Sequence, residues 1–472
     1  MKKLLLALSL LFSASGAYAQ PSDTYLLNRM TAGRMPGASM VIIKDGHWVF
    51  DRSLGKADLA NNKDVTRETV FMLASISKTM IATAVMQLWE KNLVDLDANV
   101  NAWLPFQLQH PQHPTDSITL RMLLTHTSSI QDNWGVMGPL YVYGDSPISL
   151  DSYMEDYFST TGAYYNATDN FYSYQPGTQH NYSNMGSTLA AYIVERVTGD
   201  EFHHYCDTAI FQKLCMKNTS FLLAGIPDTN LIARPYTYSG TYDDVGLYGY
   251  PDYPDGQLRT TIKGLARFMT MYLQWGEFEG ERILDSTTVA YILQQQTPVD
   301  PGQGIIFYAG QSSNGDVLWG HNGGDVGVST AMYFNMDKKT GAIVLTNGEG
   351  SPQSYPDLMV DTLYKYGLTV TPAATDTFPA CDELTSISEL PLATSMGIYP
   401  NPADDYIEIT SDGTGSQTLT VRIIDMQGRT ALQSPLGKDN KVDVHMLPAG
   451  VYQVLIKDDQ HRLRGRVGMV KR

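Results

Sequence analysis

The sequence predicts an α/β protein, in which a large mixed part is followed by a small C-terminal β-sandwich. Short apolar runs typical of buried strands lie near both ends of the large part, at residues 39–43, 48–50 and 342–345. One sheet can therefore be built from both ends of this part. A helix is expected at 357–366, entered through Pro356. In the tail, apolar and polar residues alternate over short segments separated by glycine-containing turns, which is typical of half-buried strands.

The composition supports a globular protein and excludes some classes of partner. Of 472 residues, 43% are hydrophobic and 17% are charged, which is ample material for a packed core. The formal net charge is -16. Polyanions are therefore poor partners, and neither nucleic acid nor an anionic membrane surface is expected as a ligand.

The N-terminus has the pattern of a cleavable signal peptide over residues 1–19. Two lysines precede an apolar stretch at 4–12, and Ala17 and Ala19 form the small-residue pattern of a cleavage site. The stretch is too short to span a bilayer as a folded helix, and an N-terminal anchor is the alternative interpretation. Because no later segment is long and apolar enough, we expect no transmembrane segment in the mature chain.

Ser75 and Lys78 lie three residues apart where an apolar helix is expected to begin. Residues at i and i+3 share a helix face, so the Ser75 hydroxyl and the Lys78 amine can come within hydrogen-bonding distance. This places a nucleophile beside a base, provided that burial or nearby positive charge lowers the pKa of Lys78 and keeps it neutral. The alternative is a helix-capping serine with a solvated lysine, because S-x-x-K is a short pattern.

Two further motifs follow at wide spacing, Tyr182-Ser183-Asn184 and His321-Asn322-Gly323. The accompanying strings are ITLRMLLTHTS at 118–128, PGT at 176–178, VERVTG at 194–199, MKNTSF at 216–221 and LRTT at 258–261. In this order, the motifs resemble those of the class C β-lactamase, penicillin-binding protein and esterase family of serine hydrolases. The resemblance covers most of the chain from about residue 25 to about 368, and we place this domain at 20–368.

The resemblance implies a fold and a set of roles. The fold is an antiparallel sheet flanked by helices, with a helical subdomain that carries Tyr182. Ser75 would attack an acyl carbonyl, Lys78 and Tyr182 would share its proton and return it to the leaving group, and water would then hydrolyse the acyl-enzyme. Asn184 would bind substrate and orient Lys78. The backbone N–H groups of Ser75 and Gly324 would form the oxyanion hole. No metal or organic cofactor is implied.

The third motif departs from that of β-lactamases, which normally begin it with a lysine. His321 stands there, mostly neutral near pH 7. A cationic site for a substrate carboxylate is therefore missing, unless Arg259 or another distant basic residue supplies it. Asp325 could instead meet a substrate ammonium, or it could be a solvated turn residue. Gly323 and Gly324 suit the close approach of a substrate backbone to this strand, or ordinary turn chemistry.

Together these observations predict a secreted serine hydrolase of small esters, amides or D-residue peptides. The alternative is a β-lactamase or a penicillin-binding D-Ala-D-Ala carboxypeptidase, whose substrates present a carboxylate. A catalytically silent surface-binding protein with the same fold is a further alternative. Aromatic residues crowd two segments, 134–174 and 236–253, that would border the cleft in this family. Their rings suit peptides, aryl esters or amphipathic amides, or plain loop packing.

The cysteines and remaining histidines are not expected to form a catalytic or metal site. Cys206 and Cys215 flank a helical piece and can form a bridge only if that helix ends early. Cys381 would be left over in any pairing. His203 and His204 are adjacent on an expected helix, without convincing zinc geometry.

A linker is expected at 369–395, followed by a tail at 396–472. The tail carries IYPNPA at 398–403, DMQG at 425–428, LPAGVY at 447–452 and the basic end MVKR at 469–472. These strings resemble the C-terminal sorting domain of the type IX secretion system. The resemblance implies transport across the outer membrane by the type IX machinery, usually with removal of the tail and often with attachment to the cell surface. A carbohydrate-binding or adhesive β-module is the alternative.

Overall fold

The computed structural model describes residues 18–351, 354–381, 396–411, 419–425, 430–437, 439–457 and 463–472. Residues 1–17 of the predicted signal peptide and residues 382–395 of the predicted linker lie outside the described residues. The chain divides into two compact units, Met1–Pro379 and Ala380–Arg472, which are described separately.

The larger unit is built around a seven-stranded antiparallel sheet in the order β12-β13-β14-β15-β1-β2-β3. Its strands are β1 (Gly37–Lys44), β2 (His47–Asp58), β3 (Lys63–Asp64), β12 (Tyr308–Gln311), β13 (Val317–Asp325), β14 (Val328–Asn335) and β15 (Thr340–Thr346). β1 pairs with β15, with Met40 opposite Val344. These central strands are buried on both faces, which is why they read as continuous apolar runs. The structure confirms a sheet made from both ends of this unit.

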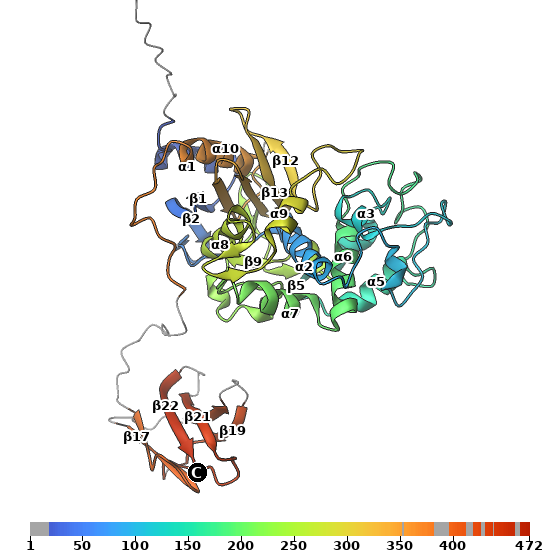
Figure 1. The fold of residues 1–472 in the computed structure, drawn as a ribbon. Helices are drawn as coiled ribbons and strands as arrows, with labels where there is room; N and C mark the ends of the chain where they lie inside the picture. Colours follow the sequence, from blue (N-terminus) through green and yellow to red (C-terminus); the bar gives the residue numbers. More distant parts are fainter. Residues whose placement is uncertain are drawn as a thin grey trace, which may run out of the picture. The chain divides into compact units, whose positions relative to one another are not determined.

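Helices cover both faces of the sheet (Figure 1). α1 (Asp23–Ala32) and α10 (Tyr355–Gly367) pack together on one face, where Met40 and Ile42 of β1 join their core. α8 (Ile262–Leu273) and α2 (Lys78–Glu90) share the other core with Val41 and Ile43. Successive residues of β1 therefore face opposite helix layers, as the pleat requires.

A helical subdomain lies beyond α2, away from the sheet (Figure 1). It contains α3 (Leu120–Leu124), α5 (Leu150–Phe158) and α6 (Asn184–Thr198), and α6 packs against α2 and α3. The other short elements are α4 (Trp134–Met137), α7 (Phe202–Cys206), α9 (Ser286–Ile292), and the strand pairs β4 (Val70–Met72) with β9 (Arg259–Thr261), β5 (Val142–Tyr143) with β8 (Tyr248–Gly249), β6 (Tyr236–Tyr238) with β7 (Tyr242–Asp244), and β10 (Glu277–Phe278) with β11 (Glu281–Arg282).

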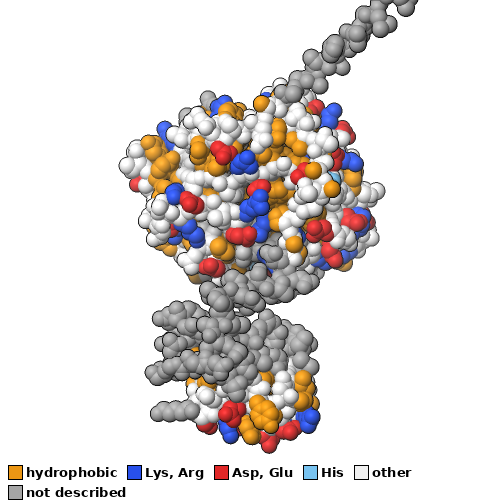
Figure 2. All heavy atoms as spheres, turned by 90° about the vertical axis from the view of Figure 1, so that its left-hand side faces the viewer, with side chains coloured by type: hydrophobic (Ala, Val, Ile, Leu, Met, Phe, Trp, Pro, Cys, Tyr) orange, Lys and Arg blue, Asp and Glu red, His pale blue; other side chains and the backbone are white. Residues whose placement is uncertain are grey.

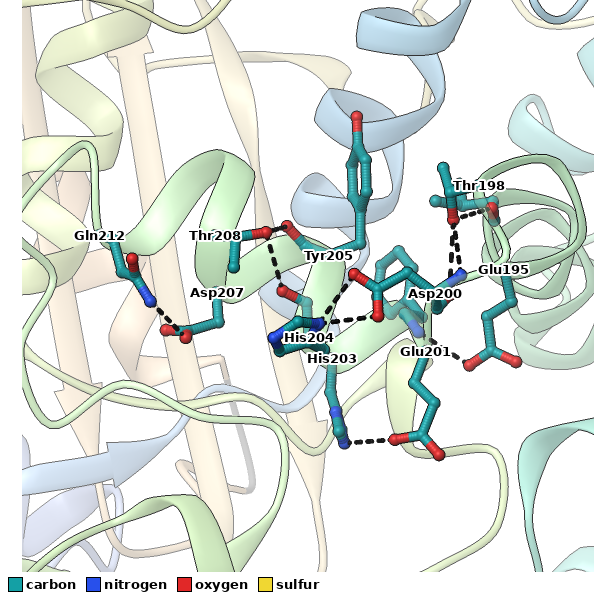
Figure 3. Close-up of polar contacts among 12 residues, drawn as sticks. Glu195, Thr198, Asp200, Glu201, His203, His204, Tyr205, Asp207, Thr208 and Gln212 are labelled. Atoms are coloured by element: carbon teal, nitrogen blue, oxygen red, sulfur yellow. Dashed lines mark hydrogen bonds and ion pairs between the residues drawn. The ribbon is translucent and has the colours of Figure 1, made fainter. Parts of the chain in front are cut away.

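The adjacent histidines of α7 point to different carboxylates (Figure 3). His204 Nδ1 lies 2.7 Å from a carboxylate oxygen of Asp200, and His203 Nε2 lies 3.0 Å from a carboxylate oxygen of Glu201. Glu195, at the end of α6, accepts the Phe202 N–H at 2.8 Å, and its burial raises the pKa of this carboxyl to about 7. Among the described residues, no group of three or more His, Cys, Asp or Glu side chains is arranged to hold a metal ion.

The cysteines differ from the sequence-based expectation. Cys206 is free and fully buried at the end of α7, whereas Cys215 and Cys381 are both disulfide-bonded. A Cys206–Cys215 bridge is therefore wrong, and so is the expectation that Cys381 is left over. The physical reason is that α7 continues directly into a π-helical turn, Asp207–Phe211, so Cys206 stays in a helical segment with its thiol in the core.

The C-terminal unit contains two antiparallel sheets, in the orders β16-β17-β20 and β19-β18-β21-β22. The strands are β16 (Met396–Tyr399), β17 (Tyr406–Ser411), β18 (Thr420–Asp425), β19 (Thr430–Pro435), β20 (Lys441–Asp443), β21 (Gly450–Lys457) and β22 (Leu463–Lys471). Ile407 and Val442 from one sheet share a buried core with Val421 and Val454 from the other. This packing confirms the predicted small β-sandwich.

Two surface properties bear on possible environments. On the face of the larger unit shown in Figure 2, Lys and Arg side chains are interspersed with Asp and Glu. Within the described parts of the chain, none of the helices has the length and apolar character needed to cross a membrane.

Candidate active site

The Ser75–Lys78 motif lies between β4 and α2. Ser75 belongs to a 3₁₀ turn, Ala74–Ser77, and Lys78 is the first residue of α2, so the serine precedes the α-helix. Ala74 has a left-handed φ of 50°, which turns the chain sharply before the serine. Lys78 is fully buried, and its Nζ donates to Ser75 Oγ at 3.1 Å. The structure therefore brings together the two residues that the spacing predicted.

The charge of Lys78 differs from the expectation. Burial acts to lower the pKa of Lys78, but the neighbouring Tyr182, Asp255 and Asp132 outweigh burial, and the net pKa is raised. Nζ also donates to the backbone oxygen of Asp255 at 2.7 Å, and it lies 5.1 Å from the centre of the Tyr182 ring. The direction of this shift is opposite to the lowered pKa that the sequence analysis expected, because the surrounding groups favour the ammonium.

Tyr182 lies two residues before the start of α6 and is 41% exposed. His126 holds its backbone on both sides: the carbonyl oxygen of His126 accepts the Asn181 N–H at 2.9 Å, and Nδ1 accepts the Ser183 N–H at 3.2 Å. The rings of His126 and Tyr182 pack with centroids 4.4 Å apart. His126 therefore positions Tyr182.

His126 is a functional candidate that the sequence-based reasoning assigned no role. Burial, with contributions from Lys78 and two further histidines, lowers the pKa of His126 well below its usual value, so the imidazole is neutral. Since Nδ1 accepts a hydrogen bond, the proton sits on Nε2, which has no partner among the described residues. The available signal was its place inside the LLTHTS string, which the structure shows to follow α3 directly.

Asn184 is the first residue of α6, and its side chain is bound by Asp132. Asn184 Nδ2 donates to Asp132 Oδ2 at 2.9 Å, and the backbone N–H groups of Asn184 and Met185 donate to the same carboxylate at 3.0 Å. Asp132 thus caps the positive end of α6. The Asn184 side-chain N–H donates to Asp132, and Lys78 Nζ donates to Ser75 and to the backbone of Asp255. The expected role of Asn184 in orienting Lys78 is therefore not supported by a direct hydrogen bond between the described side chains. Asp132 itself has no spacing signal in the sequence.

His321 lies on β13 and is buried at 2% exposure. Its Nδ1 lies 2.5 Å from the Asn322 carbonyl oxygen, an arrangement that requires the proton on Nδ1 and leaves Nε2 as a bare acceptor. Nε2 is buried without a partner in the described part of the chain. Burial lowers the pKa of His321 to about 3, so the side chain is neutral at physiological pH.

Gly323 lies in a crowded environment, whereas Gly324 lies in an open one. A Cβ on Gly323 would lie 2.2 Å from the Leu73 carbonyl oxygen and 3.0 Å from Ala74 Cβ, so this glycine allows β13 to approach the Ser75 turn. The close approach predicted for a substrate backbone is here an approach of the chain to itself. Gly324 is exposed, and a Cβ on it would meet nothing within 4 Å. Only Gly324 therefore faces open space.

Two charged residues are placed differently from expectation. Arg259 is 1% exposed and donates to the carbonyl oxygens of Gln257 and Tyr248, so it does not offer its guanidinium to a substrate carboxylate. Asp325 is not a solvated turn residue. It accepts the Tyr250 hydroxyl at 3.0 Å and the Val326 N–H at 2.7 Å, and burial raises its pKa.

The two aromatic segments divide between core and cleft. Tyr153 and Tyr157 are fully buried in the helical subdomain, where they are plain packing residues. Trp134, Tyr141 and Tyr248 instead line a cavity of about 890 Å³ that also borders Gly324 and Asp325.

Comparisons with known proteins identify related sequences and folds. Residues 23–361 match the Beta-lactamase family model, and residues 397–467 match the Secretion system C-terminal sorting domain. Penicillin-binding protein 4* of Bacillus subtilis is 26% identical over 327 residues, covering 66% of this chain and 68% of the relative. Esterase EstB of Burkholderia gladioli is 31% identical over 204 residues, covering 43% of this chain and 50% of the relative, so this match spans about half of that esterase.

Among solved structures, the D-amino acid amidase of Ochrobactrum anthropi SV3 has the same fold. Its TM-score is 0.57 at 21% identity, covering 72% of this chain and 96% of that structure. The family model spans more than half of the sequence and includes the Ser75, Tyr182 and His321 motifs. The chain therefore belongs to the beta-lactamase family of serine hydrolases.

Proposed function

We propose that this protein is an exported serine hydrolase that forms an acyl-enzyme on Ser75 with small esters, amides or D-residue peptides. The observation that supports this most directly is the 3.1 Å contact between the partly exposed Ser75 hydroxyl and the buried Lys78 amine, beside Tyr182. No step in this chemistry calls for a metal or an organic cofactor.

In this scheme, Ser75 Oγ attacks the acyl carbon while its proton passes to the Tyr182 oxygen, which carries the negative charge at the start of the step. The raised pKa of Lys78 keeps a proton on Nζ, so the lysine acts by stabilising the negative charge that moves between Ser75 and Tyr182. Tyr182 then returns the proton to the leaving group, and water repeats the sequence on the acyl-enzyme. Backbone N–H groups of Ser75 and Gly324 serve as the oxyanion donors, each worth about 2.7 to 4 kcal/mol.

The charges around the site support substrates that present no carboxylate. His321 is neutral, and its buried Nε2 offers a lone pair rather than a positive charge. Arg259 is committed to backbone carbonyls, and Asp325 adds a carboxylate on the same strand. A β-lactam or a D-Ala-D-Ala terminus would bring its carboxylate into these surroundings at an electrostatic cost. The esterase and amidase names of two related proteins agree with the same preference.

The test compares three chromogenic substrates by kcat/KM: a short-chain ester, a D-aminoacyl anilide and a cephalosporin. We expect the mature protein to prefer the ester or the anilide, and Ser75→Ala to remove the activity. A dominant cephalosporin rate would instead identify a β-lactamase. Ligand binding with no turnover of any of the three would favour the catalytically silent alternative.

The sorting domain implies export and a secreted or cell-surface location. We propose that the tail is read by the type IX machinery and removed after transport. Deleting 396–472 in a host with this system should leave the hydrolase unit inside the outer membrane, as measured by fractionation. Surface or medium location of the truncated protein would contradict this role.

A further inference from the structure

A wide cavity opens beside Gly324, and we name it the aromatic pocket. Its volume is about 890 Å³, within the range of small-molecule sites, and Trp134, Tyr141, Tyr143, Tyr248, Gly324 and Asp325 are among the residues that line it. Because Gly324 carries one of the proposed oxyanion donors, the pocket begins where the reacting group of a substrate would lie.

The walls of the aromatic pocket present ring faces. Tyr141 and Tyr248 stack with centroids 5.6 Å apart. Trp134 is 55% exposed and Tyr143 is 83% exposed, so both rings are accessible to a ligand. Ring faces bind apolar groups, and they also attract cations through their quadrupole.

Asp325 contributes a carboxylate to this pocket, and its hydrogen-bond donors are uncharged. They are the Tyr250 hydroxyl at 3.0 Å, the Tyr141 hydroxyl at 3.3 Å and the Val326 N–H at 2.7 Å. Within the described residues, none of these contacts is a salt bridge that would neutralise the carboxylate. The buried Arg259 interacts with Asp325 electrostatically, but an incoming cation would be the first group to form a direct ion pair with this carboxyl among the described residues.

Other acids lie close to Asp325. The buried carboxyls of Asp252 and Asp255 interact with those of Asp132 and Asp325, and burial together with this mutual repulsion raises the pKa of Asp252 and of Asp255. An incoming cation would relieve the repulsion. The chain as a whole carries a formal charge of -16. Such a field concentrates cations and repels anions.

We propose that the aromatic pocket binds a cationic group of the substrate, a protonated amine or a quaternary ammonium, with ring faces around it and Asp325 as its counter-charge. The inference rests on the proposed function, since it names the substrate class of the same site as cationic esters and amides. An apolar group of the same shape would contact the same aromatic rings but would form no ion pair with Asp325.

The first experiment isolates charge from shape. Acetylthiocholine and S-(3,3-dimethylbutyl) thioacetate differ in having nitrogen or carbon at the centre of the same bulky group. We expect the wild-type protein to prefer the cation by about tenfold in kcat/KM. Asp325→Asn should bring this ratio close to one, and Trp134→Leu should lower it. Trp275→Leu, at a tryptophan that is 42% exposed and does not line the pocket, should keep the ratio.

The second experiment does not depend on turnover. Ser75→Ala protein is titrated with benzyltrimethylammonium in a calorimeter, alone and with Asp325→Asn added. We expect saturable binding that weakens about tenfold without the carboxylate. Ammonium binding without hydrolysis of either thioester or of the three chromogenic substrates would overturn the proposed function but keep the pocket. Equal hydrolysis of both thioesters without ammonium binding would overturn this inference and keep the proposed function.

Discussion

Gly323→Ala tests whether the tight contact between β13 and the Ser75 turn is needed for activity. The added Cβ would lie 2.2 Å from the Leu73 carbonyl oxygen, 2.5 Å from Thr330 Oγ1 and 3.0 Å from Ala74 Cβ. Ordinary contact begins at 3.4 Å, so the overlap with the carbonyl oxygen is about 1.2 Å. Because that atom belongs to the backbone, the strand or the turn must shift.

The expected cost has two parts. Overpacking of this kind destabilises a fold by about 1 to 3 kcal/mol. A displacement of about 1 Å between the serine and its oxyanion donor lowers the rate by about 10²-fold. We therefore expect Gly323→Ala to lose about 10²-fold in kcat/KM for a short-chain ester, with a lower free energy of unfolding in urea.

The matched control is Gly324→Ala on the same strand. Its Cβ would meet nothing within 4 Å, so we expect its free energy of unfolding to stay within about 0.5 kcal/mol of wild type. If Gly323→Ala kept both wild-type kcat/KM and wild-type stability, the contact would not be limiting, and the reasoning from close approach would be refuted.

Three further predictions concern the proton path and a buried acid. Ser75→Ala should abolish ester hydrolysis without lowering the unfolding temperature, and Tyr182→Phe should slow it severely; wild-type rates in either variant would contradict the assignment. His126→Asn can retain an acceptor for the Ser183 N–H at a left-handed backbone position, whereas His126→Phe keeps a ring against Tyr182 but loses the acceptor. We expect both variants to lower kcat more than they raise KM, and to leave the pH dependence of kcat unchanged, because this histidine is already neutral. A shifted pH dependence would instead show that His126 titrates during catalysis. Burial raises the pKa of Glu195 from its ordinary value of 4.5 to about 7, so its contribution to stability is full below pH 4.5 and is lost as pH rises through 7. Glu195→Gln should remove this slope, up to about 3 kcal/mol between these limits, measured by urea unfolding at several pH values; an unchanged slope would show that another group titrates.

Local spacing made the nucleophile and its neighbour predictable. Ser75 and Lys78 are three residues apart, so their spacing allows the 3.1 Å side-chain contact that the folded structure forms. The central strands could be predicted for a similar reason, since burial on both faces leaves an unbroken apolar run. The C-terminal strands could be found because one buried face produces alternation with period two.

The disulfide-bonded state of Cys215 and Cys381 and the surroundings of the site could not be predicted in this way. No periodicity in the sequence marks either cysteine as bonded. His126 and Asp132 reach Tyr182 and Asn184 from more than fifty residues away in the chain, through contacts that only folding creates.

The sequence by itself determined the chemistry-bearing residue types, the family and the order of its motifs, because these depend on residue identity and short spacing. Only the tertiary structure decided the charges. Burial lowered the pKa of His321, whose neutrality near pH 7 was already expected, to about 3; neighbouring groups raised the pKa of Lys78; and two backbone carbonyls bound Arg259 away from the cleft. The physical reason is that a pKa depends on solvent exclusion and on groups within a few ångströms, and folding brings those groups together from distant parts of the chain.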